Sequence, residues 1–96
     1  MTDHAPSYRS LSGVAWSVEH SGLTLVRDGD GKILHLGYPE AALWDLLCRR
    51  RPLEATIRMV AAIARLETQA ARKWTFDTIQ TWVREGWVVE SGGGDG

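Results

Sequence analysis

The stretch from Leu36 to Leu47, LGYPEAALWDLL, constrains the fold of this chain more than any other feature. It reads as the end of a strand, a turn at Pro39 and the start of an amphipathic helix, in which Leu43, Trp44 and Leu47 recur at helical spacing. Proline suits a first helical turn because it has no N–H to leave unpaired and its φ is preset. The segments before this stretch read as strands, and those after it read as helices.

Three short strands are predicted before this junction. Residues 14–20 alternate apolar and polar side chains, which is typical of a half-buried strand, and a second strand follows at residues 23–27. Two Asp-Gly pairs at residues 28–31 give the strongest hairpin signal in the chain and lead to a third strand at residues 32–36. Residues 1–12 are polar and irregular, so we expect a flexible lead-in.

Three helices are predicted after the junction, at about residues 39–49, 52–66 and 68–85. Gly86 ends the third helix because it tolerates a left-handed cap, and residues 87–89 then form a short extended piece. The predicted order is βββααα, an α+β class with a winged-helix-like arrangement of a three-stranded antiparallel sheet followed by three α-helices. The helical positions expected to be buried are Leu43, Trp44, Leu46, Leu47, Ile57, Val60, Ala61, Ile63, Ala64, Thr75, Phe76, Ile79, Trp82 and Val83.

Composition restricts the class of protein. A length of 96 residues fits one domain, which we place at residues 13–90, and the SGGGDG tail at residues 91–96 is expected to be disordered. The net charge of −1 argues against a strong nucleic-acid binder. No apolar run is long enough for a membrane span, and the N-terminus lacks the pattern of a signal peptide, so a cytoplasmic protein is expected. Of the tryptophans, Trp16, Trp44 and Trp82 are expected in the core.

No catalytic constellation, cofactor motif or metal-ligand spacing is found in the sequence. The three histidines lie at positions 4, 20 and 35, without the spacing of a metal site, and the single Cys48 is interpreted as a small buried side chain. The run Arg49–Arg51 has three interpretations: a solvated helix end, a patch for an acidic partner, or a phosphate contact to nucleic acid.

The two ends of the helical half resemble the PqqD-like family of peptide chaperones. The first element of the resemblance is Leu36 followed by the run Ala41–Leu46, and the second is Ile79 and Trp82 followed by the closing Arg84–Trp87. The resemblance covers roughly residues 13–90. The family often has Asn at the position of Gly37 and Asp at the position of Trp74, and these departures favour a relative that serves a peptide other than the precursor of PQQ.

This resemblance implies a recognition element for ribosomally synthesised and post-translationally modified peptides (RiPPs). Such domains bind the leader segment of a precursor peptide in a groove between the third strand and the third helix. They present it to a modifying enzyme, often a radical SAM protein, and are not themselves enzymes. The residues that this places in the groove are Lys32, Ile33, Leu34, His35, Leu36, Trp74, Asp77, Thr78 and Thr81.

An open sheet edge is compatible with this mode of binding because an added peptide strand pairs with its free backbone groups. Leu34 and Leu36 would share one face of the third strand, and Ile33 and His35 the other. Trp74 is the strongest candidate for an anchor, with a purely structural role as the alternative. Two rival functions remain: a winged-helix DNA-binding protein, and an interaction module in another complex.

Overall fold

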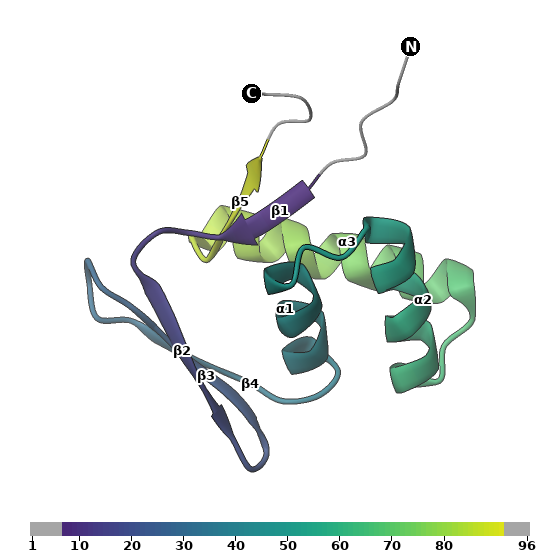
Figure 1. Cartoon of the computed structure of the whole chain (residues 1–96), viewed down its shortest axis with the longest axis horizontal. Helices are drawn as coiled ribbons and strands as arrows, with labels where there is room; N and C mark the ends of the chain where they lie inside the picture. The colour runs from purple at the N-terminus through teal and green to yellow at the C-terminus, as the bar shows by residue number, and fades with distance from the viewer. Residues whose placement is uncertain (1–6, 92–96) are drawn as a thin grey trace.

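The structure is a computed structural model that describes residues 7–91. Its elements in chain order are β1 (Ser7–Ser10), β2 (Val14–Glu19), β3 (Gly22–Arg27), β4 (Ile33–Leu36), α1 (Glu40–Cys48), α2 (Leu53–Ala64), α3 (Thr68–Glu85) and β5 (Val88–Ser91). The predicted α+β class, with three antiparallel strands followed by three helices, is confirmed. Figure 1 shows α1 between the three-stranded sheet and α2, with α3 passing behind both helices.

The main sheet has the strand order β2-β3-β4, and both of its strand pairs are antiparallel. The predicted Asp-Gly hairpin joins β3 to β4, where the Arg27 N–H donates to the Lys32 carbonyl over 2.9 Å. Between β2 and β3, the backbone of Gly22 lies so close to the Leu36 carbonyl that a Cβ would be 1.9 Å from its oxygen. Only glycine fits there, and it lets the β2–β3 turn pack against the end of β4.

A second, two-stranded sheet pairs β1 with β5, so that Tyr8 lies opposite Glu90. The structure here differs from the expected flexible lead-in, because residues 7–10 form a strand. Tyr8 is buried, and β1 and β5 lie against α1 and α3, which explains why so polar a segment is held in place. The short extended piece expected after Gly86 is present as β5. The expectations for residues 1–6 and 92–96 lie outside the described residues.

Tryptophans form the centre of the core. Trp44 on α1 is fully buried and packs edge-to-face on Trp82 of α3, with ring centroids 5.4 Å apart, and on Trp16 of β2, at 5.6 Å. The predictions for Trp44 and Trp82 are confirmed, but the one for Trp16 is wrong, since 40% of its surface is exposed. Within β2 only Val14 is buried, so the predicted half-buried strand is also wrong beyond its first residue. The helices therefore cover β3 and β4 more fully than they cover β2.

The helical faces follow the predicted spacing in part: Ile63 is exposed, and four positions expected to be buried are only half-buried, namely Ala61, Ala64, Phe76 and Val83. Ile57 and Val60 on α2 and Ile79 on α3 are completely buried, whereas Ile63 near the end of α2 is 46% exposed. Ile63 continues the apolar spacing past the region where α2 packs, so the prediction of its burial is wrong. Gly86 ends α3 with a φ of +85°, as predicted for a left-handed cap.

Two surface features complete the fold. Arg49 caps α1 and forms an ion pair with Asp45 over 2.8 Å, while Arg50 and Arg51 are exposed at the corner between α1 and α2. This placement fits a solvated helix end. Among residues 7–91, no helix is both long enough and apolar enough to span a membrane.

Candidate peptide-binding groove

The groove begins at β4, which is an open edge of the main sheet. Along an antiparallel ladder, residues that exchange hydrogen bonds alternate with residues that do not. The hydrogen bond between Arg27 and Lys32 fixes this alternation, so the even-numbered residues of β4 direct their backbone groups toward β3. Ile33 and His35 therefore direct their N–H and C=O groups to the open edge, where an added strand can pair with them.

The side chains of β4 alternate as the sequence predicts. Leu36 is buried and Leu34 half-buried on the face toward the helices, whereas Ile33 is 60% exposed and His35 exposed on the opposite face. The His35 imidazole Nδ1 lies 2.9 Å from the Thr24 hydroxyl on the neighbouring strand. Side chains of a strand added to this edge would alternate in the same way, so every second one would face the helices.

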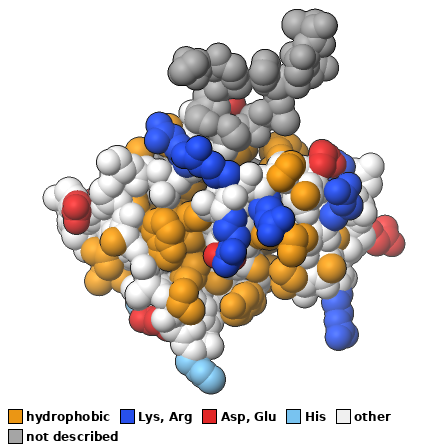
Figure 2. Space-filling view, in the orientation of Figure 1, with side chains coloured by type: hydrophobic (Ala, Val, Ile, Leu, Met, Phe, Trp, Pro, Cys, Tyr) orange, Lys and Arg blue, Asp and Glu red, His pale blue; other side chains and the backbone are white. Residues whose placement is uncertain are grey.

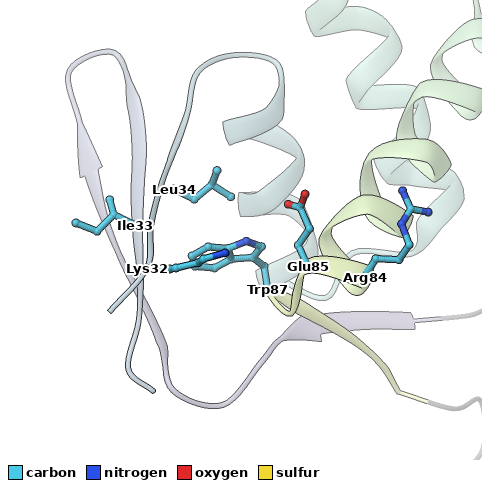
Figure 3. Close-up of a pocket in the computed structure, with 6 residues that line it drawn as sticks. All are labelled: Lys32, Ile33, Leu34, Arg84, Glu85 and Trp87. Atoms are coloured by element: carbon cyan, nitrogen blue, oxygen red, sulfur yellow. The ribbon is translucent and has the colours of Figure 1, made fainter. Parts of the chain in front are cut away.

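A hollow of about 550 Å³ lies between β4 and the C-terminal end of α3. Figure 3 shows it with α1 behind, β4 on one side and the end of α3 on the other. Its lining combines apolar surface with charges of both signs: Lys32, Ile33, Leu34, Arg84, Glu85 and Trp87. Such a lining suits a peptide that places an apolar side chain between Leu34 and Trp87 and polar groups at the rim.

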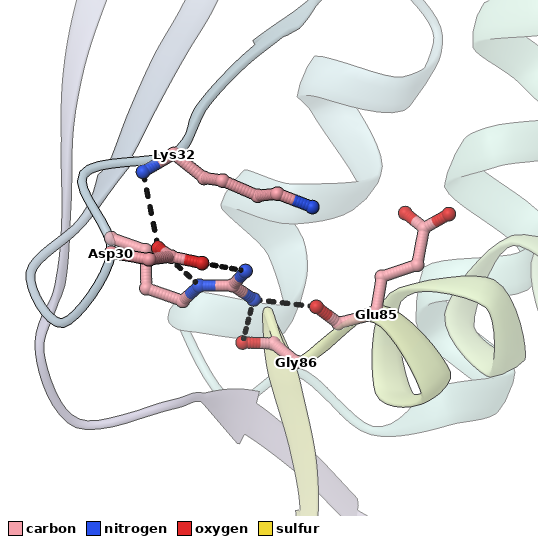
Figure 4. A network of polar contacts seen from close by, with 5 residues as sticks. Asp30, Lys32, Glu85 and Gly86 are labelled. Atoms are coloured by element: carbon pink, nitrogen blue, oxygen red, sulfur yellow. Dashed lines mark hydrogen bonds and ion pairs between the residues drawn. The ribbon is translucent and has the colours of Figure 1, made fainter.

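Arg27 ties the β3–β4 hairpin to the end of α3. Its guanidinium donates to both carboxylate oxygens of Asp30, at 3.1 and 2.8 Å, and to the backbone carbonyls of Glu85 and Gly86. It also lies over the Trp87 ring, 4.8 Å from the centroid. Figure 4 shows the polar contacts of this network. Through them one side chain connects the hairpin to the end of α3, on the two sides of the hollow.

The charges of this network stabilise one another. The hydrogen bonds from Arg27, followed by the Lys32 N–H, hold the pKa of Asp30 far below its ordinary value. In turn, the hydrogen bond to Asp30 raises the pKa of Arg27. Both groups therefore stay charged at any pH near neutrality, and the connection between hairpin and helix does not depend on pH in that range.

The helix residues chosen from the sequence do not line the hollow. Trp74 is half-buried and packs against the core cluster, and Asp77 is exposed and paired with Lys73 over 2.9 Å. Thr78 and Thr81 are half-buried, and the Thr81 hydroxyl donates to the Asp77 carbonyl. At 3.6 residues per turn, however, Trp74, Thr78, Thr81 and Glu85 fall on one face of α3, so that face continues the wall formed by Glu85.

The sequence reasoning missed the lining residues at the end of α3. Arg84, Glu85 and Trp87 belong to the family pattern at the end of the third helix, and Trp87 also to the short extended piece, but none of them was predicted to line the groove. Arg27 was predicted only as the last residue of the second strand. A signal was available for Trp87, because an apolar residue placed directly after a glycine cap often packs back against the last turn of the helix.

Two further observations concern side chains outside the hollow. Burial, and secondly the Asp45 carboxylate, raise the pKa of the Cys48 thiol to about 11. In the part of the chain from residue 7 to residue 91, no cluster of three or more His, Cys, Asp or Glu side chains is arranged to hold a metal ion. The arrangement described above combines open backbone groups, a partly apolar hollow and a charged rim, which are groups that a bound strand can contact.

The fold and this groove define a class: a small α+β domain whose open sheet edge lies next to a long helix. Among solved structures, the chain is similar to one described as "Lasso peptide synthetase B1 complexed with the leader peptide", with a TM-score of 0.79 and 12% sequence identity. The match covers 86% of this chain and 98% of the other. At this identity the likeness establishes the shared fold. No family model and no curated protein matches the sequence.

Proposed function

We propose that this chain binds the leader segment of a ribosomally synthesised precursor peptide as an additional strand on β4. The observation that carries the proposal is the open edge at Ile33 and His35 next to the hollow between β4 and α3. The resemblance to PqqD-like proteins supports it. So does the structural likeness to a lasso peptide synthetase B1 that is itself in complex with a leader peptide.

In this mode the leader backbone pairs with β4 and every second leader side chain faces α3. One apolar side chain fills the space between Leu34 and Trp87, while Lys32, Arg84 and Glu85 contact polar groups at the rim. A longer leader continues along the face of α3 that contains Thr81, Thr78 and Trp74. The remaining residues of the proposed contact surface are Ile33, His35, Leu36 and Asp77.

The chain acts in this proposal by binding and positioning alone. Chemistry on the core of the precursor is carried out by a separate modifying enzyme, of which a radical SAM protein is one candidate. The precursor belongs to a RiPP pathway, and a pathway other than that of PQQ is favoured by Gly37 and Trp74. The likeness of the fold to a winged helix stays a prediction.

A titration with two ligands separates this proposal from the DNA-binding alternative. The full chain is titrated with a labelled leader from a precursor peptide encoded near its own gene, and with labelled duplex DNA, at low and high salt. We expect leader binding with little dependence on salt. Of the three basic residues of α3, Arg72 is paired with Glu54 and Lys73 with Asp77, which leaves Arg84 as the one basic residue of this helix without an ion pair among residues 7–91. Tight, steeply salt-dependent DNA binding without leader binding would overturn the proposal.

The variant Trp74→Ala tests the proposed extension of the contact along α3. An aromatic anchor contributes on the order of 2 kcal/mol, so the leader should bind roughly 30-fold more weakly. Because Trp74 also packs partly against the core, some loss of thermal stability is expected, and affinity is measured well below the melting temperature. Gln80→Ala, which removes an exposed side chain of the same helix, is the matched control. A lower melting temperature with unchanged affinity would make Trp74 purely structural.

A further inference from the structure

The outer face of α2 carries an apolar stripe that the domain leaves exposed. Met59, Ile63 and Leu66 recur at the spacing of one helix face and are 44%, 46% and 38% exposed, with the exposed Ala62 between them. The Leu66 N–H donates to the Ala61 carbonyl over 2.9 Å, which keeps Leu66 against the last turn of α2. Figure 2 shows hydrophobic and basic side chains at the surface where α2 lies. Apolar residues that gather at a surface in this way mark contact sites for other proteins.

The stripe is separate from the face that holds α2 in the core. The residues that α2 buries are Leu53, Thr56, Ile57 and Val60. At about 100° per residue, Ile63 borders this buried face, whereas Ala62 lies on the opposite side of the helix from it. The stripe is therefore narrow and adds nothing to the core. Another α-helix fits such a stripe, because its own side chains recur at the same spacing.

Arginines follow the outer border of the stripe. Arg58 and Arg65 are both exposed and lie seven residues apart, so they fall on the same side of α2, about two turns from each other. Within residues 7–91, neither of them forms an ion pair. Glu54 lies on this side too, but its two carboxylate oxygens accept from Arg72 at 2.6 and 2.9 Å. The hydrogen bonds from Arg72, and less strongly the charge of Arg58, lower the pKa of Glu54. The border of the stripe is therefore positively charged.

We propose that this stripe binds an α-helix of another protein whose apolar face is bordered by acidic residues. The apolar side chains of the partner pack on Met59, Ile63 and Leu66. Two of its carboxylates, about two turns apart, pair with Arg58 and Arg65. The charge of the border selects this partner, because an acidic helix meets both exposed arginines while it covers the stripe.

Other occupants fit the stripe less well. When two copies of a helix pack antiparallel about a two-fold axis, the same side of each helix meets its counterpart. A second copy of α2 would thus bring Arg58 and Arg65 against the same arginines. Duplex DNA offers no apolar face to the stripe. A lipid surface is flat and would contact both borders of the stripe, whereas the arginines follow only one of them.

The stripe is independent of the proposed peptide groove. The hollow beside β4 is lined by residues 32–34 and by Arg84, Glu85 and Trp87, and α2 contributes none of its lining. A leader on β4 and a helix on α2 can therefore be bound at the same time, and a failure of either proposal leaves the other standing.

Two synthetic helices, each held helical by a side-chain cross-link, test the proposal. Both present three leucines at the spacing of Met59, Ile63 and Leu66. One carries two glutamates along one border at the spacing of the arginines, and the other carries two lysines there. Each labelled helix is titrated with the full chain, and fluorescence anisotropy gives its dissociation constant. The glutamate helix is expected to bind about 10-fold more tightly than the lysine helix, and this difference should shrink at high salt.

Variants of exposed residues assign the contact. The double variant Arg58→Glu with Arg65→Glu is expected to reverse the preference, so that the lysine helix binds more tightly. Ile63→Ser should weaken binding of the glutamate helix about 10-fold, because it removes an apolar side chain from the contact. Val18→Ser, which makes a similar replacement at an 80% exposed position of β2, is the matched control and should leave the affinity unchanged.

Four results would overturn the proposal. The first is no binding of the glutamate helix, and the second is equal affinity for the two helices. Binding to vesicles of phosphatidylcholine and phosphatidylglycerol in place of the glutamate helix would assign the stripe to a membrane surface. A mass near twice 10.7 kDa in sedimentation equilibrium, which Ile63→Ser returns to 10.7 kDa, would assign it to a second copy.

Discussion

Replacing Ile33 by proline tests strand addition at β4 most directly. The Ile33 N–H points to the open edge and makes no bond to β3, so the variant removes a donor to the peptide and none from the sheet. Proline is tolerated on edge strands when its missing N–H faces outward. The side chain of Ile33 is 60% exposed, so its loss leaves no cavity in the core.

The expected loss of affinity has two parts. The hydrogen bond between Ile33 and a leader carbonyl is worth about 1 kcal/mol net, and leaving that carbonyl without a donor adds about 1 kcal/mol or more. The proline ring also occupies the position that the carbonyl would take. A loss of about 2 kcal/mol corresponds to roughly 30-fold weaker binding. The free energy of unfolding should change by less than about 1 kcal/mol.

Fluorescence anisotropy of a labelled leader measures the affinity, and urea unfolding measures the stability. Ile33→Ala is the matched control, because it truncates the same side chain and keeps the N–H. It should bind within about 3-fold of the original chain, since an exposed side chain contributes little. If the folded Ile33→Pro variant binds the leader as tightly as Ile33→Ala does, the peptide does not pair with this edge and the reasoning is refuted.

Three further predictions concern two residues beside the groove and the thiol at the end of α1. Gly86→Ala should lower the free energy of unfolding by about 1 to 2 kcal/mol, because φ is +85° and a Cβ would lie 2.7 Å from Arg27 Nη1. Urea unfolding measures this change, and an unchanged midpoint of the unfolding curve would contradict the prediction. Because the pKa of Asp30 is lowered, its charge stabilises the fold above the ordinary pKa of 3.8, and this stabilisation is lost as the pH falls below it. Between about pH 5 and about pH 2 the melting temperature should therefore fall more for the original chain than for Asp30→Asn, and parallel curves would exclude this role. Burial raises the pKa of Cys48 from 9.0 to about 11, so at about pH 8 the thiolate fraction is roughly 100-fold lower than in the unfolded chain. Iodoacetamide should therefore alkylate the folded protein far more slowly than the unfolded chain, and equal rates would contradict this prediction.

The sequence predicts the parts of this fold that depend on local signals. The Asp-Gly hairpin, the starts of the helices and the Gly86 cap follow from turn and cap chemistry, and the burial of Trp44 follows from helical spacing. β1 was missed because Ser7–Ser10 shows no alternation and its partner lies at the other end of the chain. The alternation of side chains in β2 predicts on which face of the sheet Trp16 lies. It does not predict whether a helix covers that face at Trp16.

The candidate site was predicted on one wall only. The edge strand followed from the hairpin and the order of elements, and its alternation holds at Leu34 and Ile33. The residues of the opposing wall depend on the position along α3 that lies next to β4. No local sequence pattern encodes that position. The sequence reasoning therefore chose the middle of the helix at Trp74, whereas the hollow lies at its end, near Glu85.

The pairing of β1 with β5 has a consequence for engineering. Because Ser7 lies opposite Ser91, the two ends of the described chain lie side by side. A domain whose two ends meet can be inserted into a surface loop of a host protein without stretching either. It can equally be permuted by joining the ends with a short linker and opening the chain elsewhere. The corner between α1 and α2 suits such an opening, because Arg50 and Arg51 are exposed there and lie outside both helices.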